Sequence, residues 1–280
     1  MRRMREIRIA YVFALQLWLL LGLALPAAAN GPEIVDPAQL SIAFAREVAP
    51  RLDLPPAARE RYAAQMESSL SAAGIVVLAD QWIVVVDRNP NVQAAMIFWR
   101  SSTGEARLIG AGPASTGRHG GFEHFETPVG VFEHSLANPD FRAEGTENEL
   151  GVRGYGAKGM RVYDFGWVEA LRTWGTPRES RMRLQMHSTD PVLLEPGLGT
   201  TASKGCIRIG ATLNVFIDRY AILDADYERA LASGHKLWVL SPDRTPTPWS
   251  GRYLIVVDSG AARRPAWSPR PGLRKLACNA

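Results

Sequence analysis

The chain contains a cysteine and a histidine whose setting is typical of a covalent catalyst. Cys206 lies in the stretch SKGCIRIG. A cysteine is nucleophilic as the thiolate, so it needs a nearby base or positive charge. Lys204 and Arg208 supply positive charge, and Gly205 lets a backbone N–H approach a substrate oxygen. If a helix begins just after the cysteine, its N-terminal N–H groups would favour the thiolate and form an oxyanion hole.

The base must be a histidine, and the sequence offers five. These are His119, His124, His134, His187 and His235. His187 ends an expected strand, with eighteen residues between it and Cys206. The intervening loop can fold back and bring the two side chains together, so we expect a Cys206–His187 dyad.

Other roles for these side chains compete with catalysis. Cys206 could be an inert buried thiol, or it could form a disulfide with Cys278, which lies in a Pro- and Arg-rich end with little reason to be held in place. His119, His124 and His134 lie within sixteen residues, but their spacing fits no compact zinc pattern. The two cysteines form no Cys-x-x-Cys pair, which argues against a thiol oxidoreductase. We expect neither a metal nor a cofactor.

Residues 1–29 resemble a secretory signal peptide. A stretch with four arginines precedes an apolar run over residues 9–25 and the small residues of PAAAN. The alternative is an uncleaved anchor, because the run approaches the lower end of the roughly 17–25 residues that span a bilayer. This segment is the only membrane contact that we expect. We therefore predict an exported protein.

The charge of the remaining chain argues against a nucleic-acid partner. Residues 1–29 hold four arginines and one glutamate, so 28 of the 32 basic and 27 of the 28 acidic side chains remain after cleavage. The small excess lies in residues 241–280, which carry seven basic and two acidic side chains. The residues between the signal segment and residue 241 have no net positive charge of the kind that favours nucleic-acid binding.

The elements that position these residues read as mostly β with helices, an α+β fold. Residues 37–73 predict two helices, the second opening after Pro55-Pro56 and stopping at Gly74. Residues 117–160 are Gly-rich and predict long loops. Strands are expected in 74–80, 81–100, 106–116, 129–134, 182–188 and 236–242, with DRNP as a hairpin turn inside 81–100. A helix is expected in 211–223. Residues 252–258 could add one more strand.

Three motifs in this order resemble the L,D-transpeptidase (YkuD-type) family. They are Thr127-Pro128-Val129-Gly130, His187-Ser188, and Ser203-Lys204-Gly205-Cys206-Ile207-Arg208. The resemblance covers roughly residues 75–240. Two departures are modest: Ser188 stands where many members have Gly, and the loop to the cysteine is a few residues longer than is common. The longer loop puts the choice of donor or acceptor in doubt.

The resemblance implies a fold and a domain organisation. A β-sandwich or barrel-like catalytic domain, with a cleft under long loops, would occupy residues 75–240. Residues 30–74 would form a helical N-terminal extension, and residues 241–280 a basic Pro/Arg-rich tail. The family habit also places the protein in the periplasm.

The resemblance further implies an acyl transfer on peptidoglycan stem peptides. Cys206 would attack the carbonyl of the third residue and expel the terminal D-alanine. His187, oriented by the backbone carbonyl of Ser188, would accept and return protons. The backbone N–H groups of Gly205 and Cys206 would stabilise the oxyanion. Arg208, Ser203 and Lys204 would bind substrate or shape the pocket, although Arg208 could equally form a structural salt bridge.

The acceptor decides the reaction class. A second stem peptide, or a lipoprotein, would make the enzyme a transpeptidase. Water would make it an L,D-carboxypeptidase or endopeptidase, and the residues do not decide between the two. A non-catalytic wall-binding module is a further alternative, but its usual mark is loss of the cysteine or the histidine.

Overall fold

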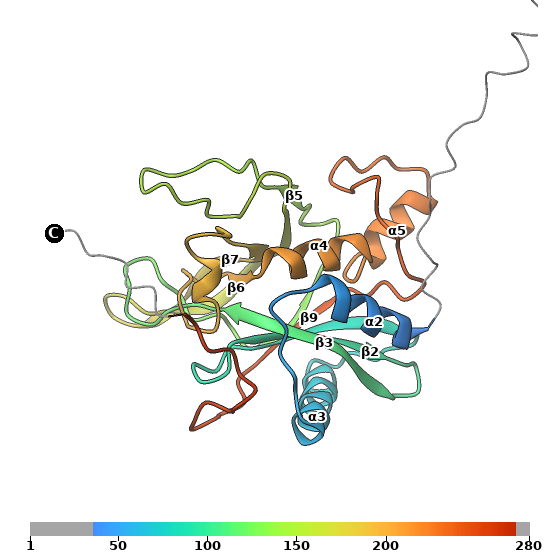
Figure 1. Cartoon of the computed structure of the whole chain (residues 1–280), viewed down its shortest axis with the longest axis horizontal. Coiled ribbons are helices and arrows are strands. Elements are labelled where there is room, and N and C mark those ends of the chain that lie inside the picture. Colours follow the sequence, from blue (N-terminus) through green and yellow to red (C-terminus); the bar gives the residue numbers. More distant parts are fainter. Residues whose placement is uncertain (1–35, 273–280) are drawn as a thin grey trace, which may run out of the picture. The chain divides into compact units, whose positions relative to one another are not determined.

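Nine strands form one sheet that positions the other elements (Figure 1). The computed structural model describes residues 36–272. The strands lie in the order β4-β9-β1-β2-β3-β8-β7-β6-β5. Their bounds are β1 Gln81–Asp87, β2 Ala94–Arg100, β3 Ala106–Ser115, β4 Gly130–Glu133, β5 Phe141–Arg142, β6 Arg161–Arg172, β7 Arg178–Ser188, β8 Ile207–Ile209 and β9 Tyr253–Val257. The expected α+β class, mostly β, is confirmed.

Four α-helices accompany this sheet in the described residues. They are α2 Pro37–Glu47, α3 Pro56–Ala72, α4 Ala211–Arg219 and α5 Ala225–Ala232, with a short 3-10 turn η1 at Glu195–Gly197. Asp36 caps α2, because its carboxylate accepts a hydrogen bond from the Ala38 N–H at 2.7 Å. The chain after α3 turns at Gly74, where φ is +68°. The two expected N-terminal helices and the helix after residue 210 are confirmed.

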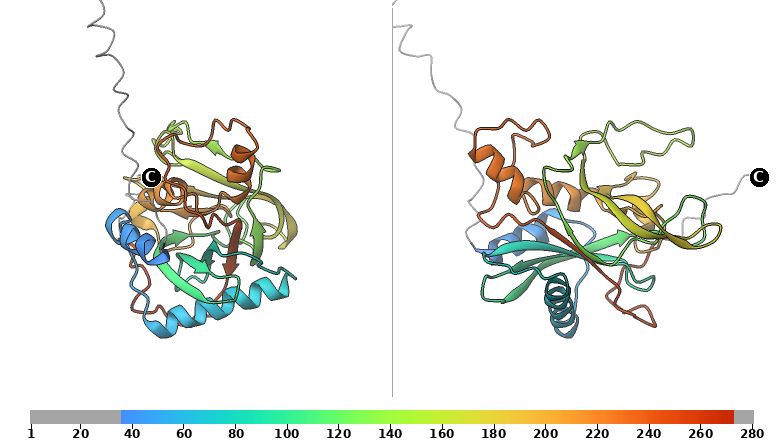
Figure 2. Two further views of the ribbon diagram at one scale, coloured as in Figure 1. Left: turned by 90° about the vertical axis from the view of Figure 1, so that its right-hand side faces the viewer. Right: turned by 180° about the vertical axis from the view of Figure 1, so that it is seen from behind.

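The sheet is covered on both faces near its centre. Helix α3 lies on one side, and α2 and α4 lie on the other (Figures 1 and 2). Trp82 and Val84 of β1 pack into the core that contains α2 and α4, whereas Ile83 and Val85 pack into the core that contains α3. A strand buried on both faces needs no polar alternation, which explains the unbroken apolar run of β1.

The pairing of the strands is mixed. Strands β1, β2 and β3 form successive antiparallel hairpins, and the DRNP turn expected between the first two is confirmed. Strands β6 and β7 form a longer antiparallel hairpin. Strand β8 lies parallel to β7, and β9 lies parallel to β1. The parallel β7–β8 pair matters most, because it brings the end of β7 beside the residues that follow Cys206.

Two expected strands are wrong. Neither 74–80 nor 236–242 joins the sheet. In the first segment Val77 is buried against the α3 core, while Val76 and Leu78 are 77% and 84% exposed. These segments have the composition of strands but no ladder partner. The sequence reasoning also missed α5 and β6.

The sheet extends beyond the expected domain limits. Strand β9 lies between β4 and β1, inside the range expected to form only a tail. Its residues Leu254 and Ile255 are fully buried, so the extra strand considered for 252–258 is confirmed. Helices α2 and α3 also contribute to the two cores. The described parts of 30–74 and 241–280 therefore belong to the same compact unit as the sheet.

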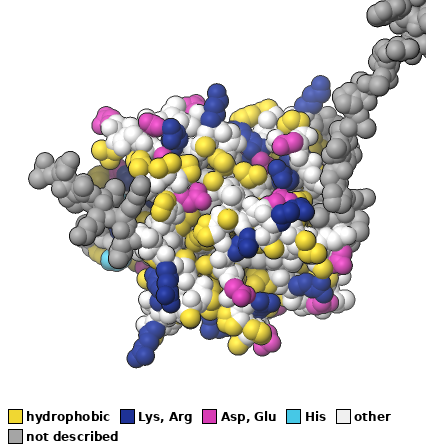
Figure 3. Space-filling view, in the orientation of Figure 1, with side chains coloured by type: hydrophobic (Ala, Val, Ile, Leu, Met, Phe, Trp, Pro, Cys, Tyr) yellow, Lys and Arg dark blue, Asp and Glu magenta, His cyan; other side chains and the backbone are white. Residues whose placement is uncertain are grey.

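Some expectations fall outside the described residues. The signal segment 1–29 and Cys278 belong to this group. Between residues 36 and 272, no helix has the length and apolar character needed to cross a bilayer. On the face seen in Figure 3, basic and acidic side chains are interspersed.

Candidate active site

Cys206 directly precedes β8, the strand that pairs with the end of β7, where His187 lies. In the parallel β7–β8 pair, Met186 is opposite Ile207 and His187 is opposite Arg208. Met186 and Ile207 are fully buried in the core. Since successive side chains of a strand point to opposite faces, His187 and Arg208 share the other face. Cys206 comes two residues before Arg208, and its Sγ lies 3.9 Å from the Arg183 carbonyl oxygen of β7, so the cysteine lies at the same end of the β7–β8 pair as His187.

The imidazole of His187 is held in one tautomer. Its Nδ1 lies 2.5 Å from the backbone carbonyl oxygen of Ser188. A carbonyl oxygen only accepts, so Nδ1 carries the hydrogen and Nε2 keeps its lone pair. Burial lowers the pKa of His187 to about 4, and the positive charge of Arg208 acts in the same direction. His187 is therefore a neutral base at neutral pH.

The thiol of Cys206 is also neutral in this geometry. It is a free thiol whose Sγ lies 3.9 Å from the backbone carbonyl oxygen of Arg183, to which S–H donates. Burial raises the pKa of Cys206, although the Gln185 N–H and the Arg208 charge oppose this rise. A neutral thiol beside a neutral imidazole favours proton transfer during attack over a preformed thiolate–imidazolium pair.

This resting state predicts slow, strongly pH-dependent alkylation. In a Cys278→Ala background, Cys206 should react with iodoacetamide more slowly at pH 7 than a free cysteine. A raised pKa leaves a smaller thiolate fraction, so the rate should rise through a pKa above the ordinary value of about 8.5. Intact-mass measurement of the rate from pH 6 to 10 checks this. An inflection below pH 8 would contradict it.

The condition for helix stabilisation of the thiolate, a helix that begins just after Cys206, is not met. Strand β8 follows the cysteine, and α4 begins only at Ala211. The N–H of Ala211, at the start of α4, donates to the carboxylate of Glu195 at 3.0 Å. This end of the helix therefore binds the loop that precedes the cysteine. The short apolar run after Cys206 pairs with the core strands β7 and β3 before the helix can begin. The proposed helix stabilisation of the thiolate is therefore wrong.

Gly205 and Ser203 shape the cysteine loop. The N–H of Gly205, expected as an oxyanion donor, donates instead to Ser203 Oγ at 3.1 Å, and Ser203 Oγ donates to the Cys206 carbonyl at 2.5 Å. Gly205 has a φ of +133°, and a Cβ there would lie 2.8 Å from Met182 Sδ. This site needs glycine for its conformation and its packing. Its N–H is not free to bind a substrate oxygen in this structure.

Thr127 ties the upstream Thr-Pro element to the same loop. Its hydroxyl accepts from the Gly117 N–H at 2.9 Å and donates to the Gly205 carbonyl at 2.7 Å. Lys204 points to the periphery, where its ammonium pairs with exposed Glu123 at 2.8 Å. A pair this exposed contributes little to stability. The structure thus gives the Thr-Pro motif a positioning role, whereas Lys204 is already paired.

Arg208 has the properties of an anion-binding side chain. Its Nη1 donates to the Ala202 carbonyl at 3.3 Å, while its buried Nε has no partner among the described residues. No ion pair of Arg208 with a carboxylate is found in residues 36–272, so the structural salt bridge is not observed there. Burial lowers the pKa of Arg208. A cation that is half-buried and incompletely paired favours an incoming carboxylate.

Three residues that the sequence reasoning did not name complete the site. The ring of Tyr155 meets the ring of His187 edge-on, with centroids 4.7 Å apart. Its hydroxyl donates to Gln185 Oε1 at 3.0 Å, and Gln185 Nε2 donates to Asp164 Oδ2 at 2.8 Å. Tyr155 comes from the Gly-rich region 117–160, whose length was the only signal for it. This network fixes the wall beside His187.

In residues 36–272, no hydrogen bond or ring contact joins another histidine to Cys206 or to His187. His134 is fully buried, with Nδ1 on the Leu223 carbonyl and Nε2 on Asp140, both at 2.8 Å. His124 Nδ1 contacts the carbonyl of Phe122. Across residues 36–272, no three His, Cys, Asp or Glu side chains converge on a point that could hold a metal ion.

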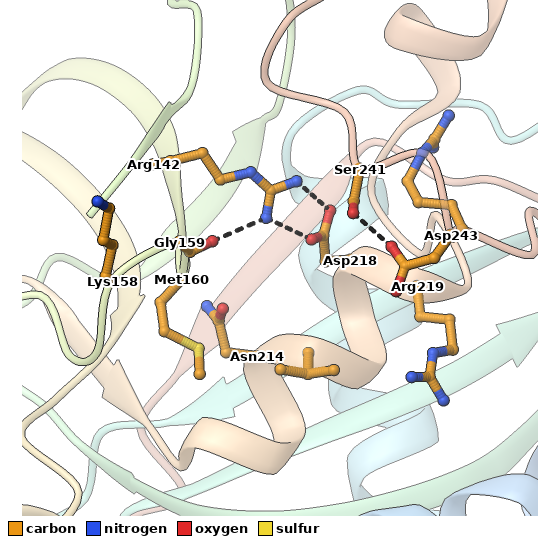
Figure 4. A pocket seen from close by; sticks show the side chains of 11 residues that line it. Arg142, Lys158, Gly159, Met160, Asn214, Asp218, Arg219, Ser241 and Asp243 are labelled. Carbon is orange, nitrogen blue, oxygen red and sulfur yellow. Dashed lines mark hydrogen bonds and ion pairs between the residues drawn. The ribbon is translucent and has the colours of Figure 1, made fainter. Parts of the chain in front are cut away.

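A polar cavity of about 240 Å³ lies elsewhere in the fold (Figure 4). Arg142 and Asp218 form a two-pronged ion pair across it, and Ser241 and Asp243 lie beside them. The lining includes neither Cys206 nor His187. Arg142, Asp218, Arg219 and Arg244 of this lining are already ion-paired.

Comparisons with known proteins give little similarity. No family model matches the chain, and no curated protein sequence matches it. Among solved structures, a similar chain is the helical cell shape determining protein Pgp2 from Campylobacter jejuni, with 13% sequence identity and a TM-score of 0.27. The match covers 75% of this chain and 59% of Pgp2, so the chain spans less than two thirds of that protein.

Proposed function

We propose that the protein is a peptidoglycan L,D-transpeptidase, a cysteine acyltransferase with a YkuD-type catalytic domain. The observation that carries this proposal is the placement of Cys206 directly before β8, which pairs with the end of β7 at His187, together with the charge of Arg208 that acts on the pKa of both residues. The Ser188 carbonyl on Nδ1 supports it, since that contact leaves Nε2 as the base. The hydrogen bond from Thr127 to Gly205, which joins the Thr-Pro motif to the cysteine motif, supports it further.

Acylation begins with proton transfer from the Cys206 thiol to Nε2 of His187. The sulfur leaves the Arg183 carbonyl and attacks the carbonyl carbon of the donor's third residue. Collapse of the tetrahedral intermediate breaks the bond to the terminal D-alanine, whose amine takes the proton from His187. Arg208 holds a donor carboxylate. We assign the oxyanion to the Cys206 N–H, because the Gly205 N–H is held by Ser203.

Deacylation reverses the proton path. The amine of a second stem peptide, or of a lipoprotein, attacks the thioester and gives a proton to His187. The C–S bond then breaks, and the Cys206 sulfur takes that proton from His187. Water in place of the amine gives an L,D-carboxypeptidase or endopeptidase with the same residues. We place this reaction in the periplasm, after export directed by residues 1–29.

Products of a purified donor test the proposal. The protein and its Cys206→Ala variant are incubated with disaccharide-tetrapeptide, with and without an amine acceptor, and the products are followed by mass spectrometry. We expect cross-linked dimers that depend on Cys206. Tripeptide alone, with acceptor present, would favour the hydrolase. Binding without turnover would favour a wall-binding module and contradict the proposal.

A further inference from the structure

Trp167 is exposed beside the active site. Its side chain on β6 is 57% exposed, although it lies next to buried Phe165 and half-buried Val168. Tryptophan is highly buried on average, so an exposed ring of this size on a regular strand is unusual. An exposed aromatic face that borders a catalytic site suits a ligand with its own apolar face.

A β-bulge turns this ring to the side of the active site. Asp164 of β6 is opposite Gln185, and Trp167 is opposite Arg183, so three residue steps on β6 match two on β7. Strand β6 therefore contains one extra residue at this point. Without the extra residue the side-chain alternation would point Trp167 toward the core. Gly166, inside the bulge, has a φ of +79°, and a Cβ there would lie 2.7 Å from Asn138. The bulge therefore places Trp167 on the face that carries Arg183 and Gln185.

Polar side chains surround the ring. The guanidinium of Arg181 lies 5.6 Å from the ring centroid of Trp167. Arg183 Nε donates to buried Asp164 at 2.7 Å, which fixes a guanidinium that remains 41% exposed. Glu169 is exposed and is opposite Arg181 in the register. We call Trp167, Glu169, Arg181 and Arg183 the Trp167 platform. It offers hydrogen-bond donors and an acceptor around one aromatic face.

The distance from the platform to the nucleophile matches the proposed donor. The carbonyl oxygen of Arg183, opposite Trp167, lies 3.9 Å from Cys206 Sγ. Strand β6 is two strands from β8, a separation of roughly 10 Å at about 4.8 Å per strand. In the donor, three residues separate the attacked carbonyl from the glycan, and three extended residues also span about 10 Å.

We propose that the Trp167 platform binds a pyranose ring of the glycan that carries the donor stem peptide. The apolar C–H face of the sugar stacks on Trp167, and its hydroxyl and amide groups pair with Arg181, Arg183 and Glu169. The β6–β7 hairpin that carries the platform extends from the sheet in the right-hand view of Figure 2. This inference rests on the proposed function, because it takes the stem peptide as the donor.

Two donors of one peptide sequence test the platform. Acylation of Cys206 is followed by intact mass at subsaturating concentrations of disaccharide-tetrapeptide and of free tetrapeptide. Wild type should prefer the glycan-bearing donor by about tenfold or more. Trp167→Ala should bring this ratio close to one. Trp238→Ala is the matched control, because Trp238 is 75% exposed and lies outside the platform, and it should keep the wild-type ratio.

Binding of the disaccharide alone separates this inference from the proposed function. Titration of free disaccharide into the Cys206→Ala protein, followed by NMR, should show binding that Trp167→Ala weakens and Trp238→Ala does not. If wild type is acylated but Trp167→Ala keeps the donor ratio, the inference fails while the proposed function holds. If neither donor acylates wild type, the proposed function fails, and the titration then decides the platform: equal binding by both tryptophan variants would overturn it.

Discussion

Replacing His187 with asparagine is expected to slow acylation of Cys206 by about 10²- to 10⁴-fold, the usual contribution of a positioned general base. The asparagine amide can still donate to the Ser188 carbonyl, as Nδ1 does now at 2.5 Å. It cannot accept the thiol proton as Nε2 does. Single-turnover acylation, measured by intact mass with the disaccharide-tetrapeptide, checks the rate.

The control for this variant is His235→Asn. His235 is exposed, and its ring contacts only the carbonyl of Ala230 near the end of α5. It should acylate at the wild-type rate. An acylation rate for His187→Asn within threefold of wild type, with an unchanged thermal unfolding midpoint, would remove His187 from the mechanism.

Replacing Arg161 with alanine is expected to lower the free energy of unfolding by about 3–5 kcal/mol, because it removes a fully buried cation that pairs with three carboxylates. Arg161 is fully buried, and its guanidinium pairs with Asp140 at 2.7 Å, with Asp224 at 2.7 Å and with Asp218 at 3.1 Å. It also lies against the ring of Tyr227 on α5, 4.8 Å from its centroid. This one side chain joins β6 to the α4–α5 region.

His134 adds a second buried cation to the same network. Both of its ring nitrogens face acceptors, the Leu223 carbonyl and the Asp140 carboxylate, so both carry a hydrogen. Burial alone would lower the pKa of His134, but the charge of Asp140 outweighs it and leaves that pKa raised. Without Arg161, Asp140 keeps His134 and Asp218 keeps Arg142. Asp224 keeps Arg244, but all three carboxylates lose a short ion pair in the interior, so we expect the loss to stay large.

Urea unfolding at pH 7 measures this loss. Arg229→Ala is the matched control, since Arg229 is 65% exposed and pairs only with Asp226 on the same helix. Its loss should stay within about 0.5 kcal/mol. A loss below about 1 kcal/mol for Arg161→Ala would mean that water or rearranged side chains satisfy the network.

The sequence carried enough information for much of the fold. Proline at the start of α3 and the apolar run of β1 marked these elements because each signal is local. Strand β6 escaped notice because its second half carries the charged residues Glu169 and Arg172 and its bulge at Gly166 breaks the alternation. The role of β9 could not be predicted, since its pairing with β1 joins residues about 170 positions apart.

In the candidate site, too, some residues could be predicted from the sequence and others could not. Cys206 and His187 were found from residue types and motif order. The backbone state of Gly205 was not, because whether its N–H is free depends on how Ser203 folds against it. Tyr155 was missed because a contact between a Gly-rich loop and a strand end leaves no period or spacing in the sequence. Side chains that act through tertiary contact need the structure.

The most direct test of the account is the mass of the protein after brief incubation with disaccharide-tetrapeptide. The account predicts an adduct on Cys206 that equals the donor minus its terminal D-alanine, sensitive to hydroxylamine as a thioester is, and absent from Cys206→Ala. A wild-type protein that releases D-alanine without any such adduct under single-turnover conditions, or a Cys206→Ala variant that still releases it, would contradict the central role of this cysteine.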